Sequence, residues 1–314
     1  MMDTTNQLIF GSIQAVLLFI LAPIIIGIIR KTKAILQSRR GASVIQPYYE
    51  LAKLFNKGQV VSNQASWIFK VTPFVSMTCT IVATTMIPVF IDISFDFLGN
   101  FLVFVYLMAM FRFFMTLSAL DTGSSFGGMG SSREVMISAI LEPTVFLCLL
   151  VVSIMAKSSY FSGIAEGIQS QLSTLLHPSM YMAFLAFFIV MLGENARYPF
   201  DNPTTHLELT MVHEAMILEY SGKALGMMEC ASWTKLTCFL ALLANLFFPF
   251  GIATVVSWDA IVIGLLAFIG KMIALAIAVA LVESSMSKFR LFKLPFIVSI
   301  SFTLAFLAAI VAII

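Results

Sequence analysis

The chain has 314 residues, of which 60% are hydrophobic and only 11% are charged, and its formal net charge is +2. A soluble domain carries about 25% charged residues, so the composition excludes a soluble globular protein. The small net charge excludes the basic surface of a nucleic-acid-binding protein. The apolar runs are continuous rather than alternating, which excludes a membrane β-barrel. We predict an all-α integral membrane protein with a single transmembrane domain that covers residues 1–314.

Eight apolar segments are candidates to cross the hydrocarbon core, which takes about 20 helical residues. The segment 178–194 is the shortest, and Pro178 suits the first turn of a helix. An even number of spans places both termini on the same side of the bilayer. The predicted spans are 8–29, 72–91, 98–119, 135–156, 178–194, 236–256, 260–282 and 293–313.

Basic residues predict the orientation of these spans. Fifteen of the 18 Lys and Arg residues lie in the odd-to-even connections, whereas Lys157 lies on the other side. Cytoplasmic connections carry the excess of Lys and Arg, so both termini should lie outside. The cytoplasmic side then holds three long connections, 30–71, 120–134 and 195–235. Within the first of them, residues 46–57 have one apolar face, which predicts a short amphipathic helix on the membrane or beneath a partner.

No pattern in the sequence predicts a metal or redox centre on this chain. The four cysteines include no Cys-x-x-Cys pair, so they offer no iron–sulfur or zinc ligand set. His213-Glu214 is not followed by the second histidine of the zinc-protease motif. The glycine-rich stretch 123–130 reads as a turn without a preceding strand, which is weak evidence for a phosphate site. Any redox centre is therefore expected in another subunit.

Four charged residues lie inside or at the end of the predicted spans: Arg112, Glu142, Lys271 and Glu283. A charge at the centre of a membrane helix costs roughly 2.5–3.5 kcal/mol on insertion scales, and less if it is paired or faces a wet cavity. For Glu142 and Lys271 we predict a role in a proton or ion path. The alternative is a static buried ion pair. Arg112 keeps its proton and should pair with a carboxylate or tune one. For Glu283, the alternative to a role in the path is a position at a helix end in contact with solvent.

The connection after the fifth span concentrates titratable side chains. Pro199 and Pro203 predict a turn-rich crossing, and residues 204–219 read as a helix with an apolar stripe. Carboxylates and imidazoles on the flanks of such a helix should titrate together, which makes proton relay near neutral pH feasible. A solvated amphipathic helix is the alternative. The titratable residues are Glu194, Asp201, His206, Glu208, His213, Glu214 and Glu219.

Motifs along nearly the whole chain resemble the respiratory complex I subunit 1 family, which includes membrane subunits of energy-converting nickel–iron hydrogenases and formate hydrogenlyases. The most specific are Glu-Asn-Ala-Arg-Tyr-Pro-Phe-Asp at 194–201 and Glu-Tyr-Ser-Gly at 219–222. The run Thr-His-Leu-Glu-Leu-Thr-Met at 205–211 is similar to the hydrogenase branch and lacks further glutamates that complex I members tend to carry there. Other matching motifs lie at 38–41, 46–48, 51–54, 112–114, 119–123, 126–130, 132–134 and 141–143.

The resemblance implies a multi-pass subunit of a prokaryotic inner (plasma) membrane. It would anchor the redox arm of a membrane-bound hydrogenase, such as formate hydrogenlyase, and couple it to ion pumping. Expected partners are the hydrogenase large and small subunits, an iron–sulfur subunit and antiporter-like membrane subunits, with the nickel–iron centre and iron–sulfur clusters in those partners. Docking of the redox arm would involve Arg39, Arg40, Asp121, Arg133 and Glu134. The ion path would run from an acidic entrance at Glu194, Asp201, Glu208, Glu214 and Glu219 through Glu142, Lys271 and Glu283.

Three alternatives stay open at the level of sequence. The first is a quinone-chamber subunit of a respiratory complex I, which the altered carboxylate pattern after Asp201 disfavours. The second is a stand-alone secondary transporter, which the lack of internal repeats disfavours. The third is a structural anchor with inert charges, which the number of charges inside the spans disfavours.

Overall fold

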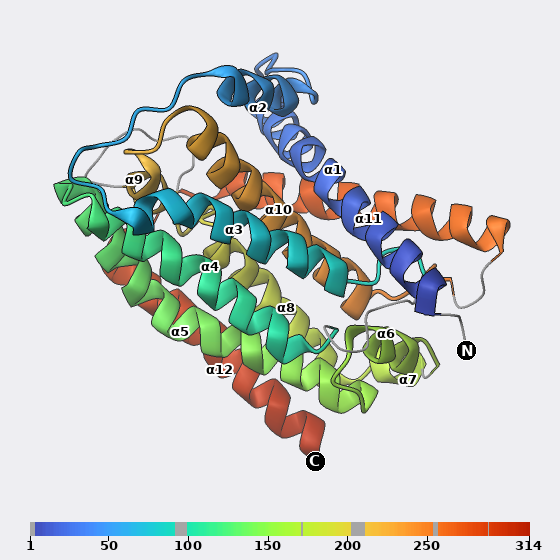
Figure 1. The fold of residues 1–314 in the computed structure, drawn as a ribbon. Helices are drawn as coiled ribbons and strands as arrows, with labels where there is room; N and C mark the ends of the chain where they lie inside the picture. The colour runs from blue at the N-terminus through green and yellow to red at the C-terminus, as the bar shows by residue number, and fades with distance from the viewer. Residues whose placement is uncertain (1–3, 92–98, 171, 202–210, 254–256, 288) are drawn as a thin grey trace.

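The computed structural model describes residues 4–91, 99–170, 172–201, 211–253, 257–287 and 289–314. Within these ranges the secondary structure is helical apart from two isolated bridges between extended residues (Figure 1). Helices suit a bilayer because every backbone N–H and C=O finds its partner within the same segment. The elements are α1 (Thr4–Leu36), α2 (Gln46–Asn56), α3 (Trp67–Met86), α4 (Phe101–Asp121), α5 (Ser125–Ala156), α6 (Phe161–Ser170), α7 (Leu172–Leu175), α8 (Pro178–Glu194), α9 (His213–Ile217), α10 (Gly222–Phe247), α11 (Trp258–Ser285), the 3-10 helix η1 (Leu291–Lys293) and α12 (Leu294–Ile313).

Seven helices of the described chain are long and apolar enough to cross a membrane: α1, α3, α4, α5, α10, α11 and α12. The shorter apolar helix α8 has 17 residues and packs against α5, α10 and α12. Each predicted span corresponds to one of these helices, and the all-α membrane class is confirmed. The start of α1 and the end of α12 lie at the end of the bundle that carries α6 and α7, opposite α2 and α9 (Figure 1). We name these the α6 end and the α2 end.

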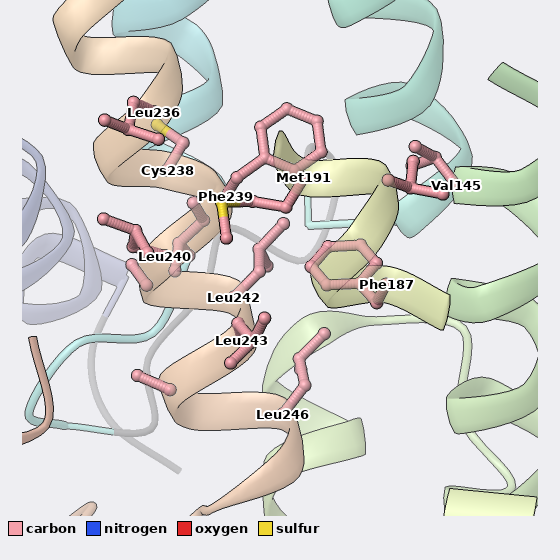
Figure 2. Packing of buried hydrophobic residues seen from close by; sticks show 14 of the residues in the cluster. Val145, Phe187, Met191, Leu236, Cys238, Phe239, Leu240, Leu242, Leu243 and Leu246 are labelled. Atoms are coloured by element: carbon pink, nitrogen blue, oxygen red, sulfur yellow. The ribbon is translucent and has the colours of Figure 1, made fainter. Parts of the chain in front are cut away.

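Helix α10 runs through the centre of the bundle. It packs against α1, α2, α3, α8 and α11, and every residue from Trp233 to Phe247 is buried. Figure 2 shows Phe239, Leu242 and Leu246 on the side of α10 that faces Phe187 and Met191 of α8. Because this helix is covered by protein, each polar group on it needs a partner within the protein.

The start of α10 differs from the prediction. The helix begins at Gly222, well before the predicted span 236–256, so the connection 195–235 is shortened to 195–221. Lys235, predicted to lie in that connection, is inside the helix and buried. Average hydropathy misplaces the boundary because Glu229 and Lys235 make this stretch look too polar for a span. In the fold, the cost of burying Lys235 is offset by a carboxylate partner.

The connection predicted at 120–134 is also shorter, because α5 begins at Ser125. Residues 125–130 of the glycine-rich stretch form the first turns of α5, whereas Gly123 lies in the turn between α4 and α5 with a φ of 65°. A Cβ on Gly127 would lie 2.5 Å from the carbonyl oxygen of Ala119, so only glycine allows α4 and α5 to approach this closely. As a result, Arg133 and Glu134 project from a helix instead of a loop.

The first connection carries the predicted amphipathic helix. Helix α1 continues to Leu36 and α3 begins at Trp67, so the connection 30–71 is reduced to 37–66. Helix α2 occupies Gln46–Asn56, in agreement with the predicted range 46–57. It packs against α1 and α10, and its Leu51 is buried while Tyr49 is exposed.

Candidate functional site

Arg112 is the centre of a buried ionic group. It lies on α4, is 4% exposed, and its guanidinium binds carboxylates from two other helices. Its Nε donates to Glu134 Oε1 at 3.0 Å, and Nη1 donates to Glu142 Oε1 at 2.7 Å. A second terminal nitrogen, Nη2, donates to Glu194 Oε2 at the end of α8. The rigid planar fork of an arginine suits it to hold several carboxylates at fixed angles.

Lys235 on α10 adds a second cation to this group. Its Nζ donates to Glu194 Oε2 at 3.1 Å and to the main-chain oxygen of Glu194 at 2.8 Å. The ammonium also lies over the ring of Phe111, 5.1 Å from its centroid. Since two cations face three carboxylates, the fully ionised group has a formal charge of −1. We call it the ionic cluster: Arg112, Glu134, Glu142, Glu194 and Lys235.

One member of the ionic cluster reaches the lateral surface of the chain. The side chain of Glu142 is 38% exposed, whereas those of Arg112 and Glu194 are 5% and 2% exposed. Glu142 lies about 20 Å from the end of α5 at Ala156, at 1.5 Å per residue. A partly exposed carboxylate at this depth is costly against lipid. It is therefore suited to a contact with another polar membrane helix.

A polar cavity of about 420 Å³ lies beside the ionic cluster at the α2 end. Asn195 follows Glu194 directly and lines the cavity, and Trp233 lines it two residues before Lys235. Walls from α1, α2, α10 and α11 contribute both acidic and basic side chains. The charged and histidine residues that line it are Arg30, Lys33, Glu50, Arg197, Asp201, His213, Glu214, Glu229 and Glu283.

Glu283 joins the end of α11 to the opposite wall of the cavity. Its Oε2 lies 2.8 Å from Lys33 Nζ on α1, and its Oε1 accepts from Arg197 Nη1 at 3.4 Å. The carboxylate is fully buried. Glu283 is therefore a paired cavity residue, not a solvated helix end. A second pocket of about 640 Å³ also contacts Lys33 and Glu283 and extends to Arg39 on the connection after α1.

Asp201 orders the short helix α9 at the edge of the cavity. Its Oδ2 accepts from the backbone N–H groups of Val212 and His213, each at 3.1 Å. Loss of water around the imidazole lowers the pKa of His213 to about 4, against the attraction of the Asp201 carboxylate. Burial, and then repulsion by Glu229, raise the pKa of Glu214 to about 8. Near neutral pH, the lowered pKa of His213 favours its neutral form, and the raised pKa of Glu214 favours its protonated form.

The structure brings together some of the predicted path residues and separates others. Glu194, Asp201, His213, Glu214 and Glu283 lie at the cavity or at its junction with the ionic cluster. Glu219 is exposed to solvent. His206 and Glu208 lie outside the described residues. Lys271 donates to Asn245, Phe248 and Phe250, whereas Glu142 binds Arg112, so the structure does not pair these two predicted path residues with each other.

The predicted docking residues divide into two groups. Arg39 and Arg40 are exposed on the connection between α1 and α2. The others make contacts inside the chain: Asp121 accepts from Ser66 N at 2.8 Å, and Arg133 donates to the carbonyl oxygen of Met211 at 2.9 Å. Glu134 belongs to the ionic cluster, because α5 begins earlier than predicted.

Several residues of the site are missing from the sequence prediction. Glu229 and Lys235 lie on the part of α10 that was expected to be a loop, and Arg197 and Lys33 bind Glu283. The Ser221-Gly222 pair before an apolar stretch is a start signal that would extend the helix over Glu229 and Lys235. No pattern in the sequence indicates the pairs with Glu283, because they join residues of distant segments.

Among the described residues, no group of three or more His, Cys, Asp or Glu side chains is placed to hold a metal ion.

Comparisons with known proteins agree on one family. The NADH dehydrogenase family matches residues 9–314. Hydrogenase-4 component C of Escherichia coli (strain K12) is 33% identical over 301 residues, which cover 96% of this chain and 94% of that protein. Formate hydrogenlyase subunit 4 of the same organism is 32% identical over 303 residues, which cover 96% of this chain and 97% of that protein.

The fold is similar to that of a chain in the membrane-bound sulfane sulfur reductase (MBS), an archaeal respiratory membrane complex. That likeness has a TM-score of 0.82 at 19% sequence identity and covers 98% of this chain and 99% of the other. At this identity it supports the fold alone. The family is shown by the match over residues 9–314 and by the two relatives above 30% identity. With its apolar helices, the chain is a multi-pass membrane protein of the NADH dehydrogenase family, to which complex I subunit 1 belongs.

Proposed function

We propose that this chain is the membrane anchor and ion-coupling subunit of a multi-subunit, membrane-bound nickel–iron hydrogenase such as a formate hydrogenlyase. The names of the two E. coli relatives support this branch of the family, and both relatives align over nearly their full length. The nickel–iron centre and the iron–sulfur clusters would lie in partner subunits. The exposed Arg39 and Arg40 would bind the redox arm at the α2 end, where the cavity also lies.

The observation that carries the coupling role is the junction of the cavity with the ionic cluster. Glu214 supplies a proton-holding group within the cavity, and Asn195 and Trp233 bring the cavity wall next to Glu194 and Lys235. Arg112 then connects Glu194 to Glu142 through a single guanidinium. Titratable groups that interact this closely titrate as one system, so a charge change at one end shifts protons at the other.

The direction of coupling follows from the positions of the two ends. Redox turnover in the docked arm would change the charge near the cavity and alter the proton occupancy of Glu214 and Glu229. The ionic cluster would transmit this change to Glu142 on the lateral face of α5. An antiporter-like membrane subunit that covers Glu142 would receive it. Reciprocity requires that an ion gradient acting on Glu142 also changes proton affinity in the cavity.

Glu142→Gln in the complete complex tests this proposal. In proteoliposomes, the variant should evolve hydrogen but translocate fewer ions per hydrogen molecule, because the lateral carboxylate can no longer change charge. Glu166→Gln makes the same chemical change at an exposed position of α6 and should leave translocation as in the wild type. Unchanged translocation in Glu142→Gln would contradict the proposal. Dependence of turnover on added quinone would instead favour the complex I alternative.

A further inference from the structure

A second polar group lies away from the ionic cluster, at the ends of α3 and α10. After Met86 of α3, the chain continues as the buried non-helical segment 87–91. After Phe247 of α10, it continues as the non-helical segment 248–253, in which Phe248 and Phe250 are 43% and 51% exposed. The two segments touch, since Ala253 N donates to Phe90 O at 2.9 Å. Non-helical backbone in a membrane protein is tolerated only where protein or water satisfies its polar groups.

Two buried amide side chains satisfy the first segment. Gln14 Oε1 on α1 accepts from Val89 N at 2.6 Å and from Phe90 N at 3.2 Å. Asn245 Nδ2 on α10 donates to the carbonyl oxygens of Pro88 at 2.7 Å and Val89 at 3.0 Å. Gln14 is 1% exposed and Asn245 is 0% exposed. These contacts fix the orientation of the Asn245 amide, so its oxygen faces the other way.

The oxygen of Asn245 and two main-chain carbonyls form a cage around the ammonium of Lys271. Lys271 Nζ donates to Asn245 Oδ1 at 2.8 Å, to Phe248 O at 2.9 Å and to Phe250 O at 3.0 Å. The three N–H groups of the ammonium are thus all used. Carbonyl oxygens at the broken ends of membrane helices are also the ligands that transporters and channels use for monovalent cations.

An apolar layer separates this cage from the ionic cluster. Asn245 and Lys235 lie on the same helix, about 15 Å apart at 1.5 Å per residue. Between them, every residue from Leu236 to Ala244 is buried, and Figure 2 shows Phe239 and Leu242 on the side of α10 that faces α8. A cation that crossed the layer from the cavity would meet the fixed positive charge of Lys271 on the far side.

We propose that the cage of Asn245 Oδ1 and the Phe248 and Phe250 carbonyls is a monovalent-cation site that Lys271 occupies with its own ammonium, so that the chain is closed to passive cation leak. The three oxygens of the cage suit a small monovalent cation, and the ammonium of Lys271 takes the place of that cation. Ions would then leave the ionic cluster only sideways, through Glu142. This role concerns the resting protein and is independent of the hydrogenase assignment.

The test is passive cation leak from proteoliposomes that contain the complete complex without substrate turnover. Lys271→Ala removes the ammonium and leaves the oxygen cage in place, whereas Lys271→Arg keeps a cation and Lys271→Met fills the volume without charge. Removal of a unit charge about 15 Å from a cation at the ionic cluster, at an effective permittivity of about 20, should raise the leak at least about fivefold. Lys223→Ala removes an exposed lysine elsewhere on the chain and should leak as the wild type does.

The expected result is a raised leak in Lys271→Ala and Lys271→Met, a tight Lys271→Arg, and closure of the Lys271→Ala leak by methylammonium. A Lys271→Ala variant as tight as the wild type would overturn the proposal. A leak in Lys271→Ala that Lys271→Met abolishes and methylammonium does not affect would also overturn it, because a packing void would then explain the leak. If neither Lys271→Ala nor Lys271→Met assembles, assembly of Lys271→Arg would support the requirement for a cation in the cage. Failure of Lys271→Arg to assemble would refute that requirement. Because no turnover is involved, the result does not depend on the proposed coupling function.

Discussion

Replacement of Arg112 by glutamine should destabilise this chain far more than replacement of an exposed arginine. The change leaves Glu134, Glu142 and Glu194 without their shared guanidinium, and Glu194 keeps only Lys235. Removal of one partner from a buried ion pair costs about 3–5 kcal/mol. For a domain of this size, each kcal/mol corresponds to about 2–4 °C in the midpoint of thermal unfolding, so Arg112→Gln should lower the midpoint by at least about 6 °C.

The four buried cysteines provide the assay. Cys79, Cys148, Cys230 and Cys238 are all shielded in the folded chain. Their alkylation during heating of the purified complex, measured by mass spectrometry, reports the unfolding of this chain alone.

Arg30→Gln is the matched control, because the Arg30–Glu50 pair is 2.7 Å long but has side chains that are 43% and 32% exposed. Solvent screening limits such a pair to about 0–1 kcal/mol. A midpoint for Arg112→Gln no lower than that for Arg30→Gln would refute the assignment of Arg112 as the centre of the cluster. Partial recovery in the double variant Arg112→Gln/Glu194→Gln would support it, since fewer carboxylates then lack a counter-charge.

Three further changes test the cavity. The pKa of Glu214 is raised from 4.5 to about 8. The contribution of Glu214 to the stability of the fold is therefore full below about pH 4.5 and is lost as the pH rises through 8. Glu214→Gln should flatten this fall of stability with pH in the same alkylation assay. Asp201→Ala leaves the N–H groups of Val212 and His213 unpaired and should cost about 1–2 kcal/mol, seen as faster hydrogen exchange at those two amides and not in α12. Glu283→Gln leaves Lys33 and Arg197 without their carboxylate and should lower the unfolding midpoint clearly more than Glu50→Gln, whose pair is exposed; equal shifts would contradict a structural pairing at Glu283.

The position of the helices along the chain was largely predictable. Continuous apolar segments about 20 residues long leave a membrane helix as the only way to satisfy the backbone, so α1, α3, α4, α5, α8, α10, α11 and α12 all appear among the predicted spans. The amphipathic pattern of residues 46–57 gave α2 for the same reason, since one apolar face needs cover. Charges within apolar segments also identified Arg112, Glu142 and Glu283 as residues with a special environment.

The partners of those charges were decided by the tertiary structure. Arg112 and Glu194 are 82 positions apart in the chain, and Lys33 and Glu283 are farther still, so no local periodicity indicates that they meet. Helix boundaries near charged residues depended on the same contacts: α10 extends back over Glu229 and Lys235 because Glu194 compensates the buried ammonium. Hydropathy measures each residue against water or lipid, whereas the cost of burying a charge depends on which group faces it. For that reason the sequence determined which segments enter the membrane, and only the packed fold determined which of their charges form the ionic cluster, the cavity and the Lys271 cage.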